Sequence, residues 1–478
     1  VTGTAVFGTL ALLSKESGAL LPLYMFVVEL AIFRLRKREG AIDRAVLAFF
    51  LLFLALPAAA GLAWMAHDPA VFFGGYVFRT FTPLERVLTE ARVIIFYLRL
   101  VFAPTLNQLG LYHDDIAVSH GLLQPPQTLA SLILILALLA TAVLVRRRAP
   151  LVTLGILWFF TGQVLESTIL PLEIAFEHRN YLADYGMLLP VCAAMLDSSR
   201  SATTLALRRS GLVLLIGMLS VITWMRAENW DSPYMEAVTE AWFHPDSAQS
   251  QYDAGRIYAD LALAGQARYA PLAYRHLEHS ASLDHNSIMA DAGLIIFASK
   301  DHSRIDPQWV SAIERRIAHA PITPSNVTSM RQLQICQEGP CRVSNRSMTA
   351  LFSAAFHNPL LYRTTQQYAD IVTIYGSFLI NHLHDPQDGR IAFEKAVHID
   401  PGQLQYQINL TRLLVAMGRY RDAHRHLAVM TRSDTLGSYG PEVGSLRQEL
   451  AALPDRNLPF PVRRTPVPAA RLLTILKG

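Results

Sequence analysis

The pattern of apolar and polar positions divides this chain into two parts that meet near Trp224. The first part is a series of apolar runs separated by short basic loops. The second part is polar and contains no apolar run of the roughly 20 residues that cross a bilayer. The apolar runs are therefore predicted to be membrane-spanning helices. They cover residues 1–13, 18–33, 45–66, 129–145, 151–165, 182–196 and 211–225.

Basic residues give these predicted helices a direction, because Lys and Arg accumulate in cytoplasmic loops. The basic clusters lie within residues 34–44, 146–148 and 200–209. If successive helices cross the membrane in opposite directions, one of the two possible orientations leaves all three clusters on the cytoplasmic side. Everything after Trp224 is then expected on the opposite side, which in a bacterium is the periplasm.

Residues 67–128 must begin and end outside in this orientation. The apolar helix predicted over 87–102 is therefore expected to lie along the membrane interface or to re-enter the membrane. The alternative is that the preceding apolar run, 71–81, also crosses.

Composition supports this division and excludes one class of function. Only 17% of the 478 residues are charged, against roughly 25% in an ordinary soluble protein. The net charge of +4 and the lack of a basic stripe argue against a nucleic-acid binder. We predict an all-α protein with a polytopic membrane domain over 1–226, a helical repeat domain over 227–452 and a Pro/Arg-rich extension over 453–478. Because Val1 lies inside an apolar run, we expect a preceding segment of the natural protein to be missing.

Ionisable residues gather in the loops that this orientation places outside. An ionised side chain at the bilayer centre costs about 2.5–3.5 kcal/mol, so such groups are expected at the interface or around a cavity. The alternative is that they are solvated or paired and only hold the loops. These residues are Lys15, Glu16, Arg79, Glu85, Glu90, Arg92, Tyr112, His113, Asp114, Asp115, Glu166, Glu173, Glu177, His178, Arg179 and Tyr181.

The spacing of three of these carboxylates has a chemical meaning. Glu166, Glu173 and Glu177 are seven and four residues apart, which would place them on one face of a helix, although Pro171 interrupts that helix. Neighbouring carboxylates raise one another's pKa, which suits a general base or a metal ligand. Arg179 and Lys15 suit the binding of a phosphate, since Arg offers a bidentate fork and Lys a point charge.

The second part of the chain has the pattern of helix pairs. Residues 404–430 fit a tetratricopeptide repeat, a helix–turn–helix unit with Gly418 at the turn and Ala423 on the second helix. A looser copy covers 255–285. Because one repeat cannot bury its own apolar face, we expect a helical solenoid over about 235–450. The alternative is an unrelated all-helical bundle.

Two cysteines are expected to form a disulfide. Cys336 and Cys341 bracket Gln-Glu-Gly-Pro, which favours a tight turn, and an extracytoplasmic location permits the bond. A zinc site at the cysteines would need two more ligands, and none stands at a fitting spacing, so no metal site is predicted. The pair His424 and His426 is interpreted as part of a solvated helix face. Residues 453–478 are predicted to form an extended strap.

Three features together resemble a known family. They are Leu12-Leu-Ser-Lys-Glu16 before an apolar span that ends in Glu29, the loop Phe176-Glu-His-Arg-Asn-Tyr-Leu182, and Arg226-Ala-Glu-Asn-Trp230 before the repeats. In this order they resemble the transmembrane-and-tetratricopeptide-repeat proteins and their bacterial relatives, over nearly the whole chain. Those proteins are similar to glycosyltransferases of the GT-C fold.

The resemblance implies an inverting transfer of a sugar from a polyprenyl-phosphate donor to an acceptor outside the cytoplasm. The family's base is a carboxylate of the first outer loop, which precedes Val1. The family's motif more often reads Glu-Arg-x-x-Tyr-Leu-Pro-Ser, whereas here His178 stands before Arg179 and Ala183-Asp184 replaces Pro-Ser. We take as candidate catalytic residues Asp114, Asp115 and Glu177, and as candidate ligands of the donor phosphate Lys15, Glu16, His178, Arg179 and Tyr181.

The leading hypothesis is thus a glycosyltransferase of a bacterial inner membrane, with the repeats in the periplasm. Its partners are a polyprenyl-phosphate sugar and a protein acceptor held by the repeats, and a divalent cation is left open as a cofactor. A second hypothesis is a non-catalytic, membrane-anchored scaffold of an envelope complex. A third is a transporter, but no paired spans broken by Gly or Pro support it.

Overall fold

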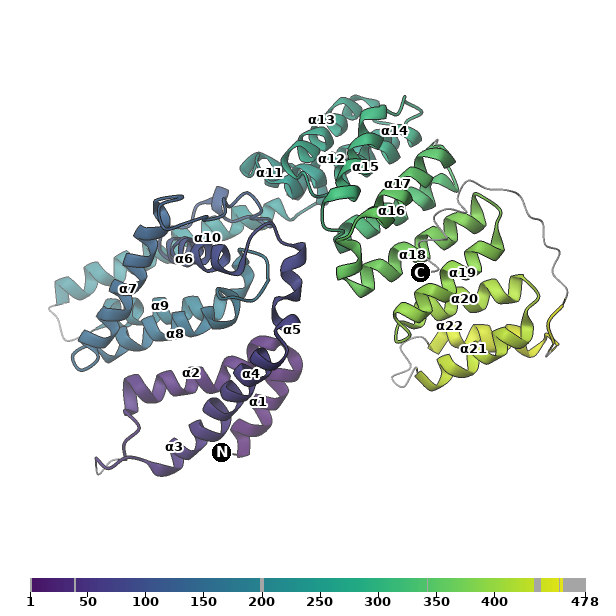
Figure 1. The fold of residues 1–478 in the computed structure, drawn as a ribbon. Helices are drawn as coiled ribbons and strands as arrows, with labels where there is room; N and C mark the ends of the chain where they lie inside the picture. The colour runs from purple at the N-terminus through teal and green to yellow at the C-terminus, as the bar shows by residue number, and fades with distance from the viewer. Residues whose placement is uncertain are drawn as a thin grey trace. The chain divides into compact units, whose positions relative to one another are not determined.

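The computed structural model describes residues 2–37, 40–197, 202–341, 343–433, 440–454 and 456–458, and within these ranges the protein is all-helical, with no strand (Figure 1). It divides into two compact units, 1–250 and 251–478. The first unit extends past position 226 to Ser250, because residues 240–249 are bonded to the loop after α6.

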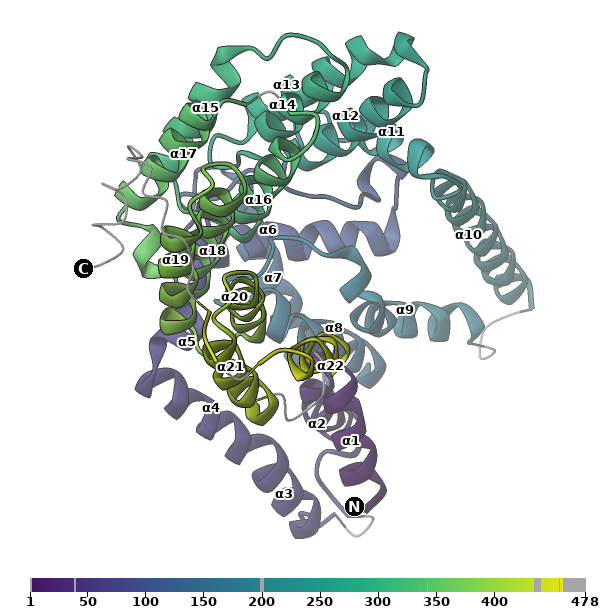
Figure 2. The ribbon, with the colours of Figure 1, turned by 90° about the vertical axis from the view of Figure 1, so that its right-hand side faces the viewer.

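The first unit consists of helices joined mostly by short loops. The long helix α10 leads directly into α11 (Figure 2). The helices are α1 (Thr2–Ser14), α2 (Leu21–Val28), α3 (Arg44–Phe50), α4 (Leu56–His67), α5 (Pro69–Phe73), α6 (Pro83–Phe102), α7 (Gln127–Val145), α8 (Pro150–Glu166), α9 (Tyr181–Leu196), α10 (Ala202–Asn229) and α11 (Pro233–Phe243).

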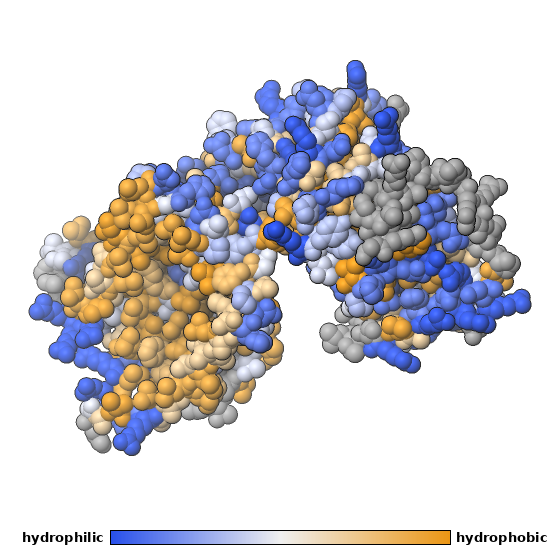
Figure 3. Space-filling view, in the orientation of Figure 1, coloured by the Kyte–Doolittle hydropathy of each residue, from blue (hydrophilic) through white to orange (hydrophobic). Residues whose placement is uncertain are grey.

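Four helical stretches of this unit have the length and composition of membrane-spanning helices: Glu16–Phe33, Arg44–His67, Gln127–Val145 and Thr203–Asn229. Their apolar side chains face outward and form a broad apolar surface (Figure 3), with Leu144 80% and Leu214 74% exposed. A soluble monomer rarely exposes so large an apolar patch. This agrees with the prediction of a membrane protein.

The other predicted spans form shorter apolar helices. Residues 150–166 and 181–196 form the apolar helices α8 and α9, and α1 has 13 residues. Within the run 71–81, α5 continues into the 3-10 helix η4 (Gly74–Phe78), and together they form one short apolar helical stretch, Pro69–Phe78.

Helix α6 organises the polar end of the unit. Thr82 and Glu85 form a capping box that fixes where α6 begins, because each side chain bonds the backbone N–H of the other. Further along, Val93 and Tyr97 of α6 pack on Phe159 of α8 in a small apolar core. The helix is therefore held by protein on one face.

The second unit continues the helices in chain order, and α18 to α21 pack as neighbours (Figure 2). Two apolar cores hold it together. The first extends over the series of helices from α14 to α20, and the second lies around α20 to α22. Its helices are α12 (Ala248–Leu263), which begins in the first unit, α13 (Ala270–Leu283), α14 (Met289–Lys300), α15 (Pro307–His319), α16 (Pro324–Gln337), α17 (Asn345–His357), α18 (Thr365–Asn381), α19 (Pro386–Ile399), α20 (Leu404–Ala416), α21 (Tyr420–Ser433) and α22 (Gly440–Ala451).

The helix–turn–helix predicted over 404–430 is present as α20 and α21. Gly418 lies at the turn with a φ of +69°, a left-handed conformation that glycine adopts without a steric penalty. Ala423 is completely buried, as the close approach of two helices requires. The looser copy is formed by α12 and α13, where Gly255 lies directly against Leu277.

Two further predictions concern the second unit. Cys336 and Cys341 lie at disulfide-bonding distance, with their Cα atoms 5.1 Å apart, which confirms the predicted pairing. Most of the predicted strap, 453–478, lies outside the described residues. Its described beginning crosses the α20–α21 turn, where the Leu458 N–H donates to the Gly418 carbonyl at 2.9 Å.

Candidate functional site

The loop between α6 and α7 is bonded to the end of α11. The backbone N–H of Leu111 donates to the Glu240 carboxylate at 2.8 Å. The Asp114 carboxylate accepts from the Ser247 hydroxyl and from the Gln249 N–H, the latter at 3.2 Å, at the beginning of α12. Arg226 of α10 pairs with Glu240 at 2.8 Å. The contacts of Leu111 and Asp114 join segments more than 100 residues apart in sequence.

Two histidine–carboxylate pairs lie side by side within this junction. His244, which ends α11, shares a 2.8 Å hydrogen bond between its Nδ1 and Asp115. His113 contacts Glu177 through its Nε2 at 2.7 Å, and Glu177 also accepts from the Gly110 N–H at 2.9 Å. The two imidazole rings meet edge to face, with centroids 5.5 Å apart. Both histidines are buried, so their polar atoms depend on these partners.

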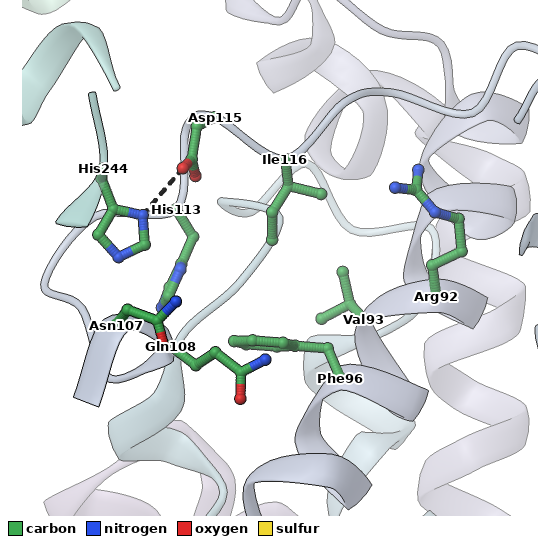
Figure 4. Close-up of a pocket in the computed structure, with 9 residues that line it drawn as sticks. All are labelled: Arg92, Val93, Phe96, Asn107, Gln108, His113, Asp115, Ile116 and His244. Atoms are coloured by element: carbon green, nitrogen blue, oxygen red, sulfur yellow. Dashed lines mark hydrogen bonds and ion pairs between the residues drawn. The ribbon is translucent and has the colours of Figure 1, made fainter. Parts of the chain in front are cut away.

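A pocket of about 260 Å³ opens beside these pairs (Figure 4). His113, Asp115 and His244 lie at one end of it, and Arg92 of α6 lies at the other. Arg92 donates through its Nη1 to the Ala117 carbonyl at 2.7 Å. The pocket thus combines an acidic and an imidazole end with a cationic end. Its lining is completed by Val93, Phe96, Asn107, Gln108 and Ile116.

The His244–Asp115 pair favours its charged form. The hydrogen bond to Asp115 raises the pKa of His244, and burial of the ring opposes this rise without cancelling it. Burial alone would raise the pKa of Asp115, but the bond to His244 and the nearby positive charge lower it overall. A proton shared by the two residues therefore rests on His244.

The predicted helix face of three carboxylates does not form. Helix α8 ends at Glu166, and the residues that follow form an irregular loop before the 3-10 helix η6 (Glu177–Arg179). The three carboxylates consequently point to different partners. Glu166 pairs with Arg179 at 2.8 Å and Glu173 with Arg79 at 2.6 Å, whereas Glu177 contacts His113. Helical spacing across Pro171 was the wrong basis for grouping them.

The candidate residues therefore separate into two groups. Asp115 lines the pocket, Glu177 supports His113, and Asp114 is bonded to the beginning of α12. The proposed ligands of the donor phosphate do not line this pocket, and Arg179 is engaged with Glu166 and with the face of the Phe176 ring. The remaining ones, Lys15, Glu16, His178 and Tyr181, have exposed side chains.

Two central residues were not identified from the sequence. Arg86 is fully buried and donates to the backbone carbonyls of Glu166, Thr168, Leu172 and Glu173, which shapes the whole loop after α8. His244 lies 129 residues after Asp115. No local spacing links either residue to its partners. The only available signal was a charged or imidazole side chain next to an apolar helix.

One group of potential metal ligands lies among the described residues, although the sequence predicted none. His113, Asp115 and His244 have ligand atoms that all lie within 4.8 Å of one another. Comparison with protein-family models, with curated proteins and with solved structures gives no match for this chain.

Proposed function

We propose that the protein is a membrane-bound glycosyltransferase that moves a sugar from a polyprenyl-phosphate donor to an extracytoplasmic acceptor. The observation that carries the proposal is the pocket beside α6. It sets the Asp115 carboxylate and its partner His244 opposite the Arg92 guanidinium. A displacement at a sugar phosphate requires a base on one side and a cation on the other.

The reaction is a single displacement at the anomeric carbon. The acceptor hydroxyl oxygen forms the new bond to that carbon and gives its proton to the Asp115 carboxylate, which His244 positions through its Nδ1. The bond between the anomeric carbon and the phosphate oxygen breaks, and its electron pair leaves with the polyprenyl phosphate. Arg92 stabilises this departing charge, since its bonds to Ala117 and Ser119 use only Nη1 among the described residues.

The size of the pocket suits the head of such a donor. At about 260 Å³ it is smaller than the roughly 300–1,000 Å³ of pockets that enclose drug-sized ligands. A sugar phosphate would enter it, whereas the long polyprenyl chain would remain on the apolar exterior of the first unit. The exposed apolar side chains of that unit offer such a surface.

The second unit supports the choice of a protein acceptor. Its helices follow one another in chain order, and its sequence predicts tetratricopeptide repeats, which bind peptides and proteins on a stacked helical surface. We place this unit in the periplasm of a bacterium, since the basic clusters within 34–44, 146–148 and 200–209 orient the helices that precede it.

A non-catalytic scaffold is the second candidate, and a specific observation favours it. Arg179 and Glu177, which the family resemblance names as site residues, are both bonded to other side chains of the protein. Such pairs suit a structural role at the junction of the loops. In this case the first unit anchors the repeats, and the repeats recruit the partners.

Substitution in the pocket separates the two candidates. Asp115→Asn and Arg92→Ala are compared with Asp114→Asn, which changes a neighbouring carboxylate that does not line the pocket. The proposal predicts that the two pocket variants assemble normally but lose glycan transfer, whereas Asp114→Asn retains it. Unchanged transfer in both pocket variants contradicts the proposal. Loss of complex assembly on deletion of the repeats, with no effect of the pocket variants, supports the scaffold.

A further inference from the structure

We propose that His113, Asp115 and His244 bind one divalent transition-metal ion of the zinc class. The ligand atoms of the three residues lie within 4.8 Å of one another, so one ion reaches all three with small side-chain rotations. His113 is 8% exposed and His244 is 7% exposed, which shields the nitrogen ligands from bulk water. The inference rests on these residues and not on the proposed sugar transfer, in which Asp115 and His244 act in their metal-free form.

The contacts of His113 leave one of its nitrogens as a ligand. Its Nε2 lies 2.7 Å from the Glu177 carboxylate, whose ionised oxygens accept hydrogen bonds and donate none. The Nε2 therefore carries the hydrogen, and Nδ1 keeps its lone pair. A carboxylate that orients a metal-binding histidine through its other nitrogen is a frequent arrangement in metal sites. Glu177 is in turn held by the Gly110 N–H at 2.9 Å.

The contact between His244 and Asp115 provides the other two ligands. Their facing atoms, Nδ1 and a carboxylate oxygen, are 2.8 Å apart. Both atoms carry lone pairs, so an ion that binds both would replace the hydrogen bond between them. The second nitrogen of His244, Nε2, is buried without a hydrogen-bond partner among the described residues and lies beside Gly110.

The set of ligands selects the class of metal. Two imidazole nitrogens with one carboxylate suit zinc and its neighbours, whereas Mg²⁺ and Ca²⁺ prefer oxygen ligands throughout. Three protein ligands leave a fourth position of a tetrahedral ion for water or a ligand. That position faces the pocket, since all three residues line it and 23% of the Asp115 side chain is exposed. Arg92 at the far end favours an anionic fourth ligand.

Zinc binding by the purified full chain tests the proposal directly. The protein, solubilised in detergent and freed of any histidine tag, is dialysed against buffered Zn²⁺, and bound metal is measured by mass spectrometry. We expect one zinc per chain in the unmodified protein and none in the double variant His113→Gln/His244→Gln. The double variant His424→Gln/His426→Gln, which removes two histidines of the second unit, is the control and retains the zinc. Glu177→Gln should weaken binding about 10- to 100-fold.

A second measurement keeps the test decisive if the double variant does not fold. Co²⁺ added to the unmodified protein should give the visible absorption of a tetrahedral site, and Asp115→Asn should change that spectrum. The proposal is overturned by zinc bound at less than one per chain in the unmodified protein. It is equally overturned by zinc retained in a folded His113→Gln/His244→Gln variant, or by a cobalt spectrum that Asp115→Asn leaves unchanged. No sugar donor is used, so these results are independent of the proposed transfer.

Discussion

Arg179 and Glu166 form an ion pair across the loop between α8 and α9, with 2.8 Å between Nη1 and Oε2. The pair is partly buried, with 22% and 16% of the two side chains exposed. Arg179 also lies over the Phe176 ring, 4.3 Å from its centroid. The geometry gives this arginine a structural role, although the sequence motif in which it stands suggests phosphate binding.

A double-mutant cycle distinguishes these two roles of Arg179. If the pair holds the loop, Arg179→Ala and Glu166→Gln each destabilise the protein by about 1–3 kcal/mol, because each leaves a partner unpaired. The double variant should then lose less than the sum, as measured by thermal unfolding in detergent. A phosphate-binding Arg179 gives another pattern: Arg179→Ala alone weakens donor binding, and Glu166→Gln does not.

Arg86 should be the most sensitive residue of the polar end of the first unit. Its side chain is fully buried, pairs with Glu90 at 2.8 Å and bonds four backbone carbonyls of the loop after α8. Arg86→Lys retains the charge but not the planar fork that reaches these carbonyls. We expect it to cost about 1–3 kcal/mol of stability, because buried carbonyls lose their donors. Protease resistance of the loop at 166–176 measures this, with Arg99→Lys, at an exposed position of α6, as the control.

Gly110 should be required for the position of His244. A Cβ atom added to Gly110 would lie 2.5 Å from the His244 Nε2, closer than any ordinary contact. Gly110→Ala therefore displaces the imidazole and should reduce both zinc binding and glycan transfer. Gly121→Ala is a matched control in the same loop, because an added Cβ there has no neighbour within 4 Å. If Gly110→Ala and Gly121→Ala bind zinc and transfer sugar equally well, His244 tolerates the displacement.

The stability of the second unit should depend on pH because of Asp291. Burial raises its pKa to about 6, although the paired Arg316 guanidinium lowers it. An acid whose pKa is higher in the folded than in the unfolded protein stabilises the fold when protonated. This contribution is complete below pH 4 or so, and it is lost as the pH rises through about 6.

The loss should amount to at most about 3 kcal/mol, and Asp291→Asn should remove it. Hydrogen exchange of the α14 and α15 amides in the full chain, measured between pH 4 and 7, reports the local stability. In the unmodified protein, exchange corrected for its intrinsic pH dependence should become faster across this range. If the exchange rates of Asp291→Asn change with pH in the same way as those of the unmodified protein, the effect belongs to another group.

The apolar helices and the helix pairs could be predicted because their signals are local. The run 129–145 becomes α7 with a shift of two residues at its beginning, and the turn at Gly418 lies where a glycine between two helical patterns places it. The cysteine pair was also predictable, since only four residues separate Cys336 from Cys341. Each of these features depends on residues that are close in sequence, no further apart than one pair of adjacent helices.

The candidate site could be predicted only in part, because its contacts are long-range. The basic loops predicted that Asp115 and Glu177 lie on the same side of the membrane. In the structure Asp115 contacts His244, and Glu177 contacts His113. The choice of partners depends on how α6 and α11 pack, which no spacing in the sequence reveals. Pro171 is the clearest case, because the loop around it turns the neighbouring glutamates away from one another.

Donor turnover by the unmodified protein tests the central claim most directly. The full chain is reconstituted in liposomes that contain a polyprenyl-phosphate sugar, and the release of free polyprenyl phosphate in the presence of periplasmic acceptor protein is measured. The account predicts release with one equivalent of sugar transferred to the acceptor, and loss of both in Asp115→Asn. Absence of release from the unmodified protein across a panel of polyprenyl-phosphate sugars, or equal release by Asp115→Asn, would contradict it.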